Sequence, residues 1–313
     1  MTCTAERVAV LCGGEGAERE VSLRSGAAVC AALCEAGWCA EAVDLRSLED
    51  VPSLKGFDAA FVAMHGAWGE DGRLQARLDA MGLPYTGSDP GACALAMNKW
   101  LSREAFQRAE LALPKGVLLP SGAANLKDVR TALGEDVVVK PCCGGSTVGV
   151  SILKGVTQDG LDAAVELARR EYDGAVLIEE YIDGPELTAA VWERDGEAKA
   201  LPIIEIAPHT GFYDYSNKYT SGATDYLVPA PLAPETAQRL SAAAEAAHRA
   251  LGCRDYSRAD FRLGRDGTPR ILEVNTAPGM TATSLVPKAA RAAGVEFSDF
   301  TAGLVRMALR RGS

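Results

Sequence analysis

Three oxygen-bearing side chains near the C-terminus are spaced like ligands of a divalent cation. Asp260 lies on one predicted strand, and Glu273 and Asn275 lie on the next, beyond a short turn. Because side chains alternate along a strand, all three can point to one face. Oxygen donors that leave room for water and phosphate oxygens suit Mg²⁺. A solvated strand pair with charged faces is the alternative, and the apolar residues and constrained turn around Glu273 and Asn275 disfavour it.

A lysine and a glycine-rich loop follow another predicted strand. The run Lys140–Gly149 places the lysine at the strand end, followed by backbone that glycines leave free to fold over an anion. Backbone amides and a lysine charge together suit a phosphate group. Taken alone, an ordinary hairpin turn explains the loop equally well, so its interpretation depends on the downstream carboxylates.

An earlier glycine cluster, Gly13–Gly16, does not complete a nucleotide-binding motif. The chain has no GxxxxGK[ST] run, and Arg19 stands where a dinucleotide fingerprint needs a third small residue for close helix packing. This disfavours a nicotinamide dehydrogenase built on the first strands. A structural turn and a ligand site are equal interpretations of the cluster.

The composition predicts a globular protein of two or three domains. The 313 residues are 48% hydrophobic and 24% charged. A net charge of -10 repels phosphate backbones and anionic lipids, so neither nucleic acid nor membrane is expected as a partner. The nine cysteines contain no CxxC pair or zinc spacing, and the first residues read as neither a secretory signal nor a spanning helix. We therefore expect free thiols and a cytoplasmic protein.

The order of predicted elements indicates an α/β fold with α+β character in the C-terminal part. A β-α-β unit opens the chain, and a third strand ends at His65, where ligands bind in such sheets. A second α/β unit follows, and then strands, a polar aromatic loop and an Ala-rich helix. The main predicted elements are Arg7–Cys12, Glu18–Gly37, Ala40–Asp44, Asp58–Met64, Lys115–Leu119, Val137–Lys140, Val148–Leu153, Leu161–Tyr172, Ala175–Glu179, Leu187–Glu193, Lys199–Ile206, Glu235–Leu251, Asp260–Leu263 and Arg270–Val274.

Many ordered segments together resemble the D-alanine:D-alanine ligases of the ATP-grasp superfamily. The resemblance runs through nearly all of the chain, which makes it far more specific than any one motif. The matching segments are Gly13-Gly14, Ala17–Ser22, His65-Gly66, Pro84–Ser88, Lys140-Pro141, Gly145-Ser146, Gly184–Glu186, Phe212–Tyr215, Lys218-Tyr219, Asn275-Thr276, Pro278–Met280 and Ser284–Pro287.

The resemblance implies a three-domain ATP-grasp architecture and a ligase function. An N-terminal Rossmann-like domain would span 1–88, a central subdomain 89–182, and a C-terminal subdomain 183–313 with a lid loop at 208–225. The implied reaction joins two D-alanines through a D-alanyl phosphate, with release of ADP and phosphate, for peptidoglycan synthesis. Relatives are usually dimers, so a homodimer is expected by analogy.

The implied cofactors are ATP and Mg²⁺. Asp260, Glu273 and Asn275 would hold two Mg²⁺ ions, for which Mn²⁺ can substitute. The nucleotide would lie between the central and C-terminal domains, where lysines supply the local cations that an acidic protein needs for phosphate. The ATP-binding residues carried over are Lys99, Lys140, Gly145, Ser146, Glu179, Glu180, Tyr181, Ile182, Glu186, Lys218 and Asn275.

The substrate residues follow from the same resemblance. The first D-alanine would place its ammonium near Glu18 and its carboxylate near His65 and Arg258. The alternative for His65 is a purely structural role, as for many lone histidines at strand ends. The carried-over substrate-binding residues are Glu18, Val21, His65, Arg258, Ser284 and Leu285. Those assigned to catalysis are Glu18, Ser146, Tyr219, Arg258 and Gly279, of which Glu18, Ser146 and Tyr219 match a hydrogen-bonded triad that ties the lid to the other domains.

Two departures from the family lie near the nucleotide, and three other functions stay open. Cys142-Cys143-Gly144 replaces a polar stretch, and Glu180 stands where many relatives have lysine, which puts nucleotide affinity and thiol sensitivity in question. The alternatives are D-alanyl-D-lactate ligation, D-alanyl-D-serine ligation and a non-catalytic nucleotide-binding module. Tyr219 favours D-alanine, because phenylalanine there would suggest lactate.

Overall fold

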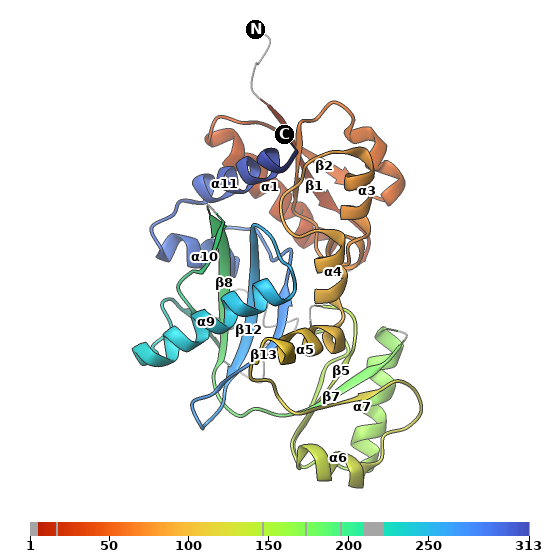
Figure 1. Ribbon diagram of the computed structural model, residues 1–313. Coiled ribbons are helices and arrows are strands. Elements are labelled where there is room, and N and C mark those ends of the chain that lie inside the picture. The colour runs from red at the N-terminus through yellow and green to blue at the C-terminus, as the bar shows by residue number, and fades with distance from the viewer. Residues whose placement is uncertain are drawn as a thin grey trace.

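Three β-sheets follow one another along the molecule and carry helices on their faces (Figure 1). The computed structural model describes residues 6–16, 18–145, 147–172, 174–194, 196–209 and 222–312. Within these residues no helix has the length and apolar character needed to cross a bilayer.

The first sheet is parallel. Its strands β1 (Arg7–Gly13), β2 (Cys39–Leu45) and β3 (Ala59–Val62) lie in the order β2-β1-β3. The middle strand β1 is apolar along most of its length because both of its faces are covered, as in other parallel sheets. The helical segments of this part are α1 (Arg19–Glu35), η1 (Leu48–Leu54), α2 (Ala67–Glu70) and α3 (Arg73–Met81).

Two short helices lead from the first sheet to the second. Asp89 caps α4 (Pro90–Met97), and Asn98 caps α5 (Lys99–Arg108) by accepting from two backbone amides of its first turn. The second sheet holds β4 (Gly116–Leu119), β5 (Val137–Pro141), β6 (Ser151–Leu153) and β7 (Val176–Glu180) in the order β4-β7-β5-β6. Helices α6 (Leu126–Leu133) and α7 (Gln158–Glu171) pack against it.

Every strand pair of the second sheet is antiparallel. The α+β character therefore begins earlier in the chain than we predicted, although the fold class is confirmed. The strand predicted at Val148–Leu153 begins only at Ser151, because the residues before it form turns.

The third sheet forms the centre of the molecule and is also antiparallel. Its order is β11-β10-β8-β12-β13, with β9 paired to β8, and α9 (Pro234–Ala250) covers one face. The strands are β8 (Glu186–Arg194), β9 (Glu197–Ala200), β10 (Ile204–Pro208), β11 (Thr224–Leu227), β12 (Tyr256–Leu263) and β13 (Pro269–Asn275). The lid predicted at 208–225 connects β10 to β11, and its residues 210–221 lie outside the described residues.

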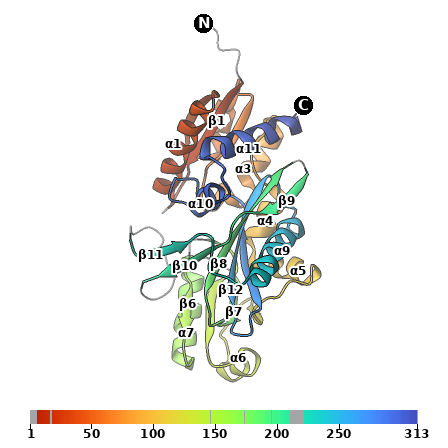
Figure 2. The ribbon, with the colours of Figure 1, turned by 90° about the vertical axis from the view of Figure 1, so that its left-hand side faces the viewer.

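The last helix returns to the first sheet. After α10 (Leu285–Ala292), which packs against β8 and α11, helix α11 (Phe297–Gly312) lies beside α1, as Figures 1 and 2 show from two sides. Phe300 and Leu304 of α11 join Val8 and Phe61 of the first sheet in one apolar cluster. This helix was not among the elements predicted from the sequence. It fastens the first sheet to the third, which fixes two walls of the site described next.

Candidate active site

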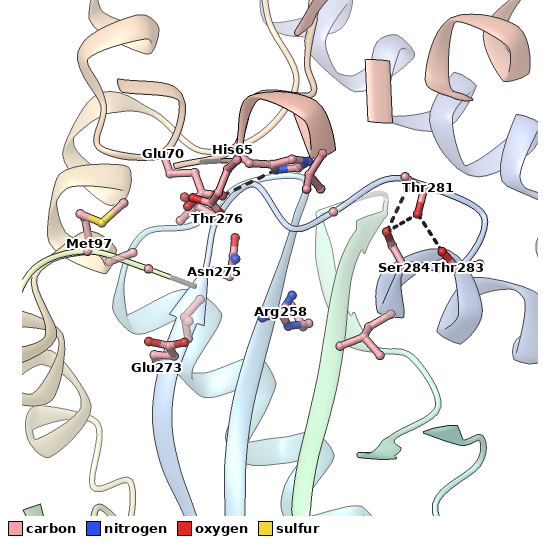
Figure 3. Close-up of a pocket in the computed structure, with 18 of the residues that line it drawn as sticks. His65, Glu70, Met97, Arg258, Glu273, Asn275, Thr276, Thr281, Thr283 and Ser284 are labelled. Atoms are coloured by element: carbon pink, nitrogen blue, oxygen red, sulfur yellow. Dashed lines mark hydrogen bonds and ion pairs between the residues drawn. The ribbon is translucent and has the colours of Figure 1, made fainter. Parts of the chain in front are cut away.

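Two adjoining clefts hold most of the side chains that the sequence singled out. The first, of about 460 Å³, opens between the first sheet, the ends of β12 and β13, and the start of α10 (Figure 3). In Figure 3, Arg258 stands near its centre, with Glu273 and Asn275 on one side and Ser284 on the other. The predicted substrate and catalytic residues along it are Glu18, Val21, His65, Arg258, Gly279, Ser284 and Leu285.

The second cleft, of about 140 Å³, lies between the second and third sheets. Apolar side chains of Val138, Ile152 and Leu272 line part of it and offer a surface suited to a flat ring. The predicted ATP or metal residues that line it are Lys99, Lys140, Gly145, Glu179, Glu180, Tyr181, Ile182, Glu186, Asp260 and Glu273. Lys99, Gly144, Gly145 and Glu273 line both clefts, so the two spaces share one wall.

The β12–β13 hairpin sets the directions of the candidate metal ligands. Asp260 pairs directly with Glu273, and Arg258 pairs with Asn275, so these four side chains share one face of the antiparallel ladder. The register then shifts, because Phe261 pairs with Ile271 and Leu272 is left without a partner in the ladder. This bulge leaves Leu272 and Glu273, which are neighbours in sequence, both lining the nucleotide cleft.

Asp260 is held by a cation of its own strand. Arg258 donates to both carboxylate oxygens, from Nε at 2.9 Å and from Nη2 at 2.7 Å. Thr188 of β8 donates to the same carboxylate at 2.6 Å. Both charged side chains are largely buried, so each neutralises the other in this structure.

The lysine at the shared wall contacts groups from two sheets. Lys99 Nζ donates to the carbonyl oxygen of Gly144 at 2.5 Å and lies 3.4 Å from a carboxylate oxygen of Glu273. Its backbone amide donates to the carbonyl of Cys142 at 2.8 Å. The capped start of α5 thus delivers a positive charge to the point where the clefts meet.

Glu179 is buried between two cations. Only 2% of the residue is exposed, and its carboxylate lies 2.5 Å from Lys140 and 2.5 Å from Arg103. Arg103 also donates to the carbonyl oxygen of Pro114 at 2.7 Å. In this arrangement Glu179 fixes the position of Lys140. Arg103 belongs to no sequence motif and was not predicted.

His65 is buried and engaged at both ring nitrogens. Nδ1 lies 3.1 Å from the carbonyl oxygen of Ala277, and Nε2 lies 2.8 Å from the hydroxyl of Ser25. Because a carbonyl only accepts, the proton belongs on Nδ1 and Ser25 donates to Nε2. His65 therefore ties the loop after β13 to α1, which supports its structural role beside the predicted substrate contact.

Glu70 is a residue of the first cleft that the sequence analysis missed. Its carboxylate lies 3.8 Å from His65 Nδ1, and 12% of the side chain is exposed. Burial raises the pKa of Glu70, the nearby carboxylate of Glu18 raises it further, and the proximity of His65 and Arg258 opposes the rise. No motif singles out Glu70, because its place depends on how α2 folds back over β3.

Two tight backbone approaches shape the first cleft. A side chain at Gly66, whose φ is +73°, would meet a carboxylate oxygen of Glu18 at 2.5 Å. A side chain at Gly279 would meet the hydroxyl of Ser284 at 2.9 Å.

Ser284 is the N-cap of α10 without a capping bond of its own, and it accepts from the amide of Thr281 at 3.0 Å. Ser284 and Leu285 both line the cleft, so the N-terminus of α10 lies at its wall, where the amides of a helix start suit a carboxylate.

Three predicted residues cannot be placed. Ser146, Lys218 and Tyr219 lie outside the described residues, so their predicted roles stay predictions.

Asn275 Oδ1 accepts from the amide of Ala277 at 3.0 Å, which leaves one lone pair of that oxygen for a further donor or ligand.

The donor set fits Mg²⁺ completed by other oxygens rather than a metal caged by protein alone. Among the residues that the structure describes, no three His, Cys, Asp or Glu side chains gather to hold a metal. Asp260 and Glu273 supply two carboxylates and Asn275 an amide oxygen on one face. Mg²⁺ usually binds through one or two carboxylates together with phosphate oxygens, which agrees with a site on the wall of the nucleotide cleft.

The sheets and the two adjoining clefts define an enzyme of the ATP-grasp fold. The sequence matches the family model "D-ala D-ala ligase N-terminus" over residues 39–88 and "D-ala D-ala ligase C-terminus" over residues 110–306. The chain therefore belongs to the D-alanine–D-alanine ligase family, which confirms the resemblance seen in the sequence.

Individual relatives agree over nearly the whole length. The D-alanine–D-alanine ligase of Anaeromyxobacter sp. (strain Fw109-5) is 48% identical over 300 residues, which cover 95% of this chain and 94% of that protein. The crystal structure of the D-alanine–D-alanine ligase from Bacillus anthracis complexed with ATP has a TM-score of 0.86 at 34% identity, and the match covers 99% of this chain and 98% of that one. The VanG D-Ala:D-Ser ligase from Enterococcus faecalis has a TM-score of 0.84 at 29% identity, with 97% and 99% covered.

Proposed function

We propose that the protein joins two D-alanines to D-alanyl-D-alanine in an ATP-dependent reaction that releases ADP and phosphate and serves peptidoglycan synthesis. The observation that carries the proposal is the shared wall of the two clefts, formed by Lys99, Gly144, Gly145 and Glu273. The two clefts adjoin only where the same residues line both of them. At that point a terminal phosphate in one cleft can meet a carboxylate in the other. The names of the relatives support this reading.

In the first step, the carboxylate of one D-alanine attacks the γ-phosphate to give D-alanyl phosphate and ADP. Glu18 lines the amino-acid cleft near the start of α1 and suits the substrate ammonium. Arg258, in the middle of the cleft, suits the substrate carboxylate. Lys99 and Lys140 position the phosphates by charge. When Asp260 and Arg258 bind their respective partners, their mutual ion pair must rearrange.

Asp260, Glu273 and Asn275 would hold the Mg²⁺ that accompanies the nucleotide. Bound there, Mg²⁺ would neutralise charge on the phosphates. The ion pair of Lys99 with Glu273, at 3.4 Å, already places a cation and a candidate ligand at the same point of the wall. Ser146, Lys218 and Tyr219 would complete the nucleotide side and the lid.

In the second step, the amine of the other D-alanine attacks the acyl carbon and phosphate leaves. The carboxylate of this substrate would bind at the Ser284 hydroxyl and the Leu285 amide, at the start of α10. The oxyanion that forms would lie between Arg258 and the Gly279 amide. Each of these groups lines the same cleft, which supports one site for both chemical steps.

An assay of phosphate release tests the proposal. The purified protein receives ATP, Mg²⁺ and D-alanine, either alone or together with D-serine or D-lactate, and the product is identified by mass. D-alanine is expected to give the fastest release and a dipeptide product. No D-alanine-dependent phosphate release would leave only the non-catalytic nucleotide-binding alternative.

A second candidate is a ligase that accepts D-serine or D-lactate at the second site. The similarity to the VanG D-Ala:D-Ser ligase supports this second candidate. Tyr219 favours D-alanine, so Tyr219→Phe is expected to gain depsipeptide product from D-lactate. Unchanged product ratios would remove Tyr219 from this assignment.

The domain division at 1–88, 89–182 and 183–313, a homodimer and a cytoplasmic location are further proposals. The division is supported by the three sheets, each of which lies mainly in one of these ranges. Light scattering of the purified chain would test the dimer, because a monomeric mass at working concentration contradicts it.

A further inference from the structure

Two adjacent thiols stand at the wall of the nucleotide cleft. Cys142 is buried, with 5% of the residue exposed, whereas Cys143 is exposed and lines the cleft together with Lys99 and Lys140. No step of the proposed reaction uses either thiol. The family resemblance also departs at this point, since relatives carry a polar stretch there.

The backbone around the two thiols is held firmly. The Cys142 amide donates to the carbonyl of Ala175 at 2.9 Å, and its carbonyl accepts from the Lys99 amide at 2.8 Å. Cys143 forms an isolated antiparallel bridge with Asn98. The site is therefore built between β5, β7 and the start of α5, and both sulfurs are carried on ordered backbone.

The buried thiol lies at the N-terminus of a helix. Cys142 Sγ donates to Asn98 Oδ1 at 3.3 Å, and Asn98 is the N-cap of α5. The pKa of the Cys142 thiol is lowered to about 6, chiefly by a hydrogen bond from Cys143 and then by the Trp100 amide and Lys99, against the opposing effect of burial. The partner thiol has its pKa raised by the same hydrogen bond. Cys143 follows Cys142 directly in the chain, so a second thiol is attached to the next Cα beside this buried one.

A direct disulfide is a poor product for this pair. Adjacent Cα atoms are about 3.8 Å apart across a trans peptide, whereas disulfides usually join Cα atoms about 4.4–6.8 Å apart. A single soft atom that binds both sulfurs lengthens the bridge and removes this conflict. Thiolate pairs prefer soft centres over the hard cations that oxygen ligands bind, so this site does not compete for Mg²⁺.

We propose that Cys142 and Cys143 form a two-thiol binding site for trivalent arsenic, and that an occupied site blocks the nucleotide cleft. With a monosubstituted arsenic(III) oxide, both S–H bonds break and two As–S bonds form. The oxygen leaves as water with the two protons, and arsenic stays in its +3 state. No oxidant or reductant is needed.

Occupation of the site changes the wall that the nucleotide uses. The group on arsenic projects from Cys143, which faces the cleft. The next residue, Gly144, accepts from Lys99 Nζ at 2.5 Å through its carbonyl, so an adduct there crowds this lysine. The loss of activity rests on the proposed function, whereas formation of the adduct does not.

The test uses the full-length reduced protein with phenylarsine oxide, and reads covalent mass and phosphate release separately. One equivalent is expected to bind at the peptide that contains both thiols and to abolish activity. ATP should slow the formation of the adduct, and a dithiol such as 2,3-dimercaptopropanol should remove the arsenic again. Cys143→Ser and Cys142→Ser are each expected to need at least tenfold more reagent, relative to their own untreated rates.

A second thiol pair supplies the matched control. Cys30 and Cys34 on α1 both donate to the carbonyl of Ala40, at 3.5 and 3.7 Å, and they line neither described cleft. Cys34→Ser is expected to retain wild-type activity and wild-type sensitivity. An adduct found only at Cys30 and Cys34, or Cys143→Ser inhibited as readily as wild type, would overturn the proposal. A protein without ligase activity that still shows an ATP-protected adduct would refute the proposed function alone.

Discussion

The two faces of the β12–β13 hairpin differ in almost every physical respect. The front face carries Arg258 and Asp260, whose charges neutralise each other at the cleft. The back face carries Ala259 and Phe261, both fully buried against the apolar side of α9. Because side chains alternate along a strand, one short sequence supplies both the charged face and the apolar core.

Residues that are neighbours on β12 therefore have different roles: one lines a cleft, and the next packs in the core. A substitution on the front face changes side chains that line the two clefts, whereas one on the back face changes the packing of the third sheet. The separation is testable, because neighbouring positions should affect different measurements.

The largest expected effect belongs to the back face. Phe261→Ala removes a fully buried ring from the cluster between β12 and α9, and should lower the free energy of unfolding by about 3–5 kcal/mol. Urea unfolding measures it. The folded fraction at low temperature should keep its turnover close to wild type, and a selective loss of turnover would break the comparison.

The neighbouring front-face position should show the opposite pattern. Asp260→Asn removes a carboxylate from the candidate metal ligands and is expected to lower turnover by about 10²–10³-fold, or about 3–4 kcal/mol in activation free energy. Its loss of stability should be smaller than that of Phe261→Ala, because an amide oxygen still accepts from Thr188. Phosphate release at saturating ATP and D-alanine measures the rate, and a wild-type rate would remove Asp260 from the metal site.

A buried histidine sharpens the comparison through pH. His248 on α9 is 1% exposed and hydrogen-bonds to Ser257 of the back face at 2.8 Å. Burial lowers the pKa of His248 to about 4, helped by the charge of Arg249. Between pH 6.5 and 4 the unfolded state therefore binds more protons than the folded state, so stability should fall by up to about 3 kcal/mol as pH falls through this window.

The variant His248→Asn isolates this contribution. Its free energy of unfolding, measured from pH 7.5 to 4 by urea titration, should fall less steeply than that of the wild type between pH 6.5 and 4. Activity at pH 7.5 should differ little, since His248 is neutral there and lines neither active-site cleft. Parallel stability curves for the two proteins would contradict the assignment.

The smallest effect is expected at the start of α10, across the amino-acid cleft from the front face. Ser284→Ala removes a hydroxyl that lines the amino-acid cleft, and should raise the KM for the second D-alanine about tenfold, or about 1.4 kcal/mol, with little change in kcat. The Leu285 amide at the start of α10 still faces the cleft and retains part of the binding. A fall in kcat at unchanged KM would place Ser284 in the chemical step instead.

The sequence predicted the alternation of this hairpin but not its irregularity. The spacing of Asp260, Glu273 and Asn275 was sufficient to predict a common face, because the period of a strand is fixed by its backbone. The slipped register beside Leu272 depends on how β13 fits against β12, and no residue type announces it. The sequence therefore predicted the common face of the candidate ligands, but not the bulge that places both Leu272 and Glu273 on the wall of the nucleotide cleft.

Long-range pairings were the main omissions. The bridging position of His65 between Ser25 and Ala277, and the pairing of Arg103 with Glu179, join residues far apart in the chain. Local patterns carry no signal for such contacts, because they exist only once the sheets are packed. The resemblance named residues that line the clefts, but it could not show which charges are already paired within the protein.

The return of α11 to the first sheet has a consequence for synthesis on the ribosome. Val8 and Phe61 are synthesised well before Phe300, which belongs to the same apolar cluster. Arg311 of the same helix binds Asp255 and donates to the carbonyl of Tyr85 at 2.8 Å, which closes the joint between the two sheets. Until α11 has been synthesised, this apolar surface of the first sheet therefore stays exposed on the growing chain, and this is the stage at which a chaperone would protect the protein.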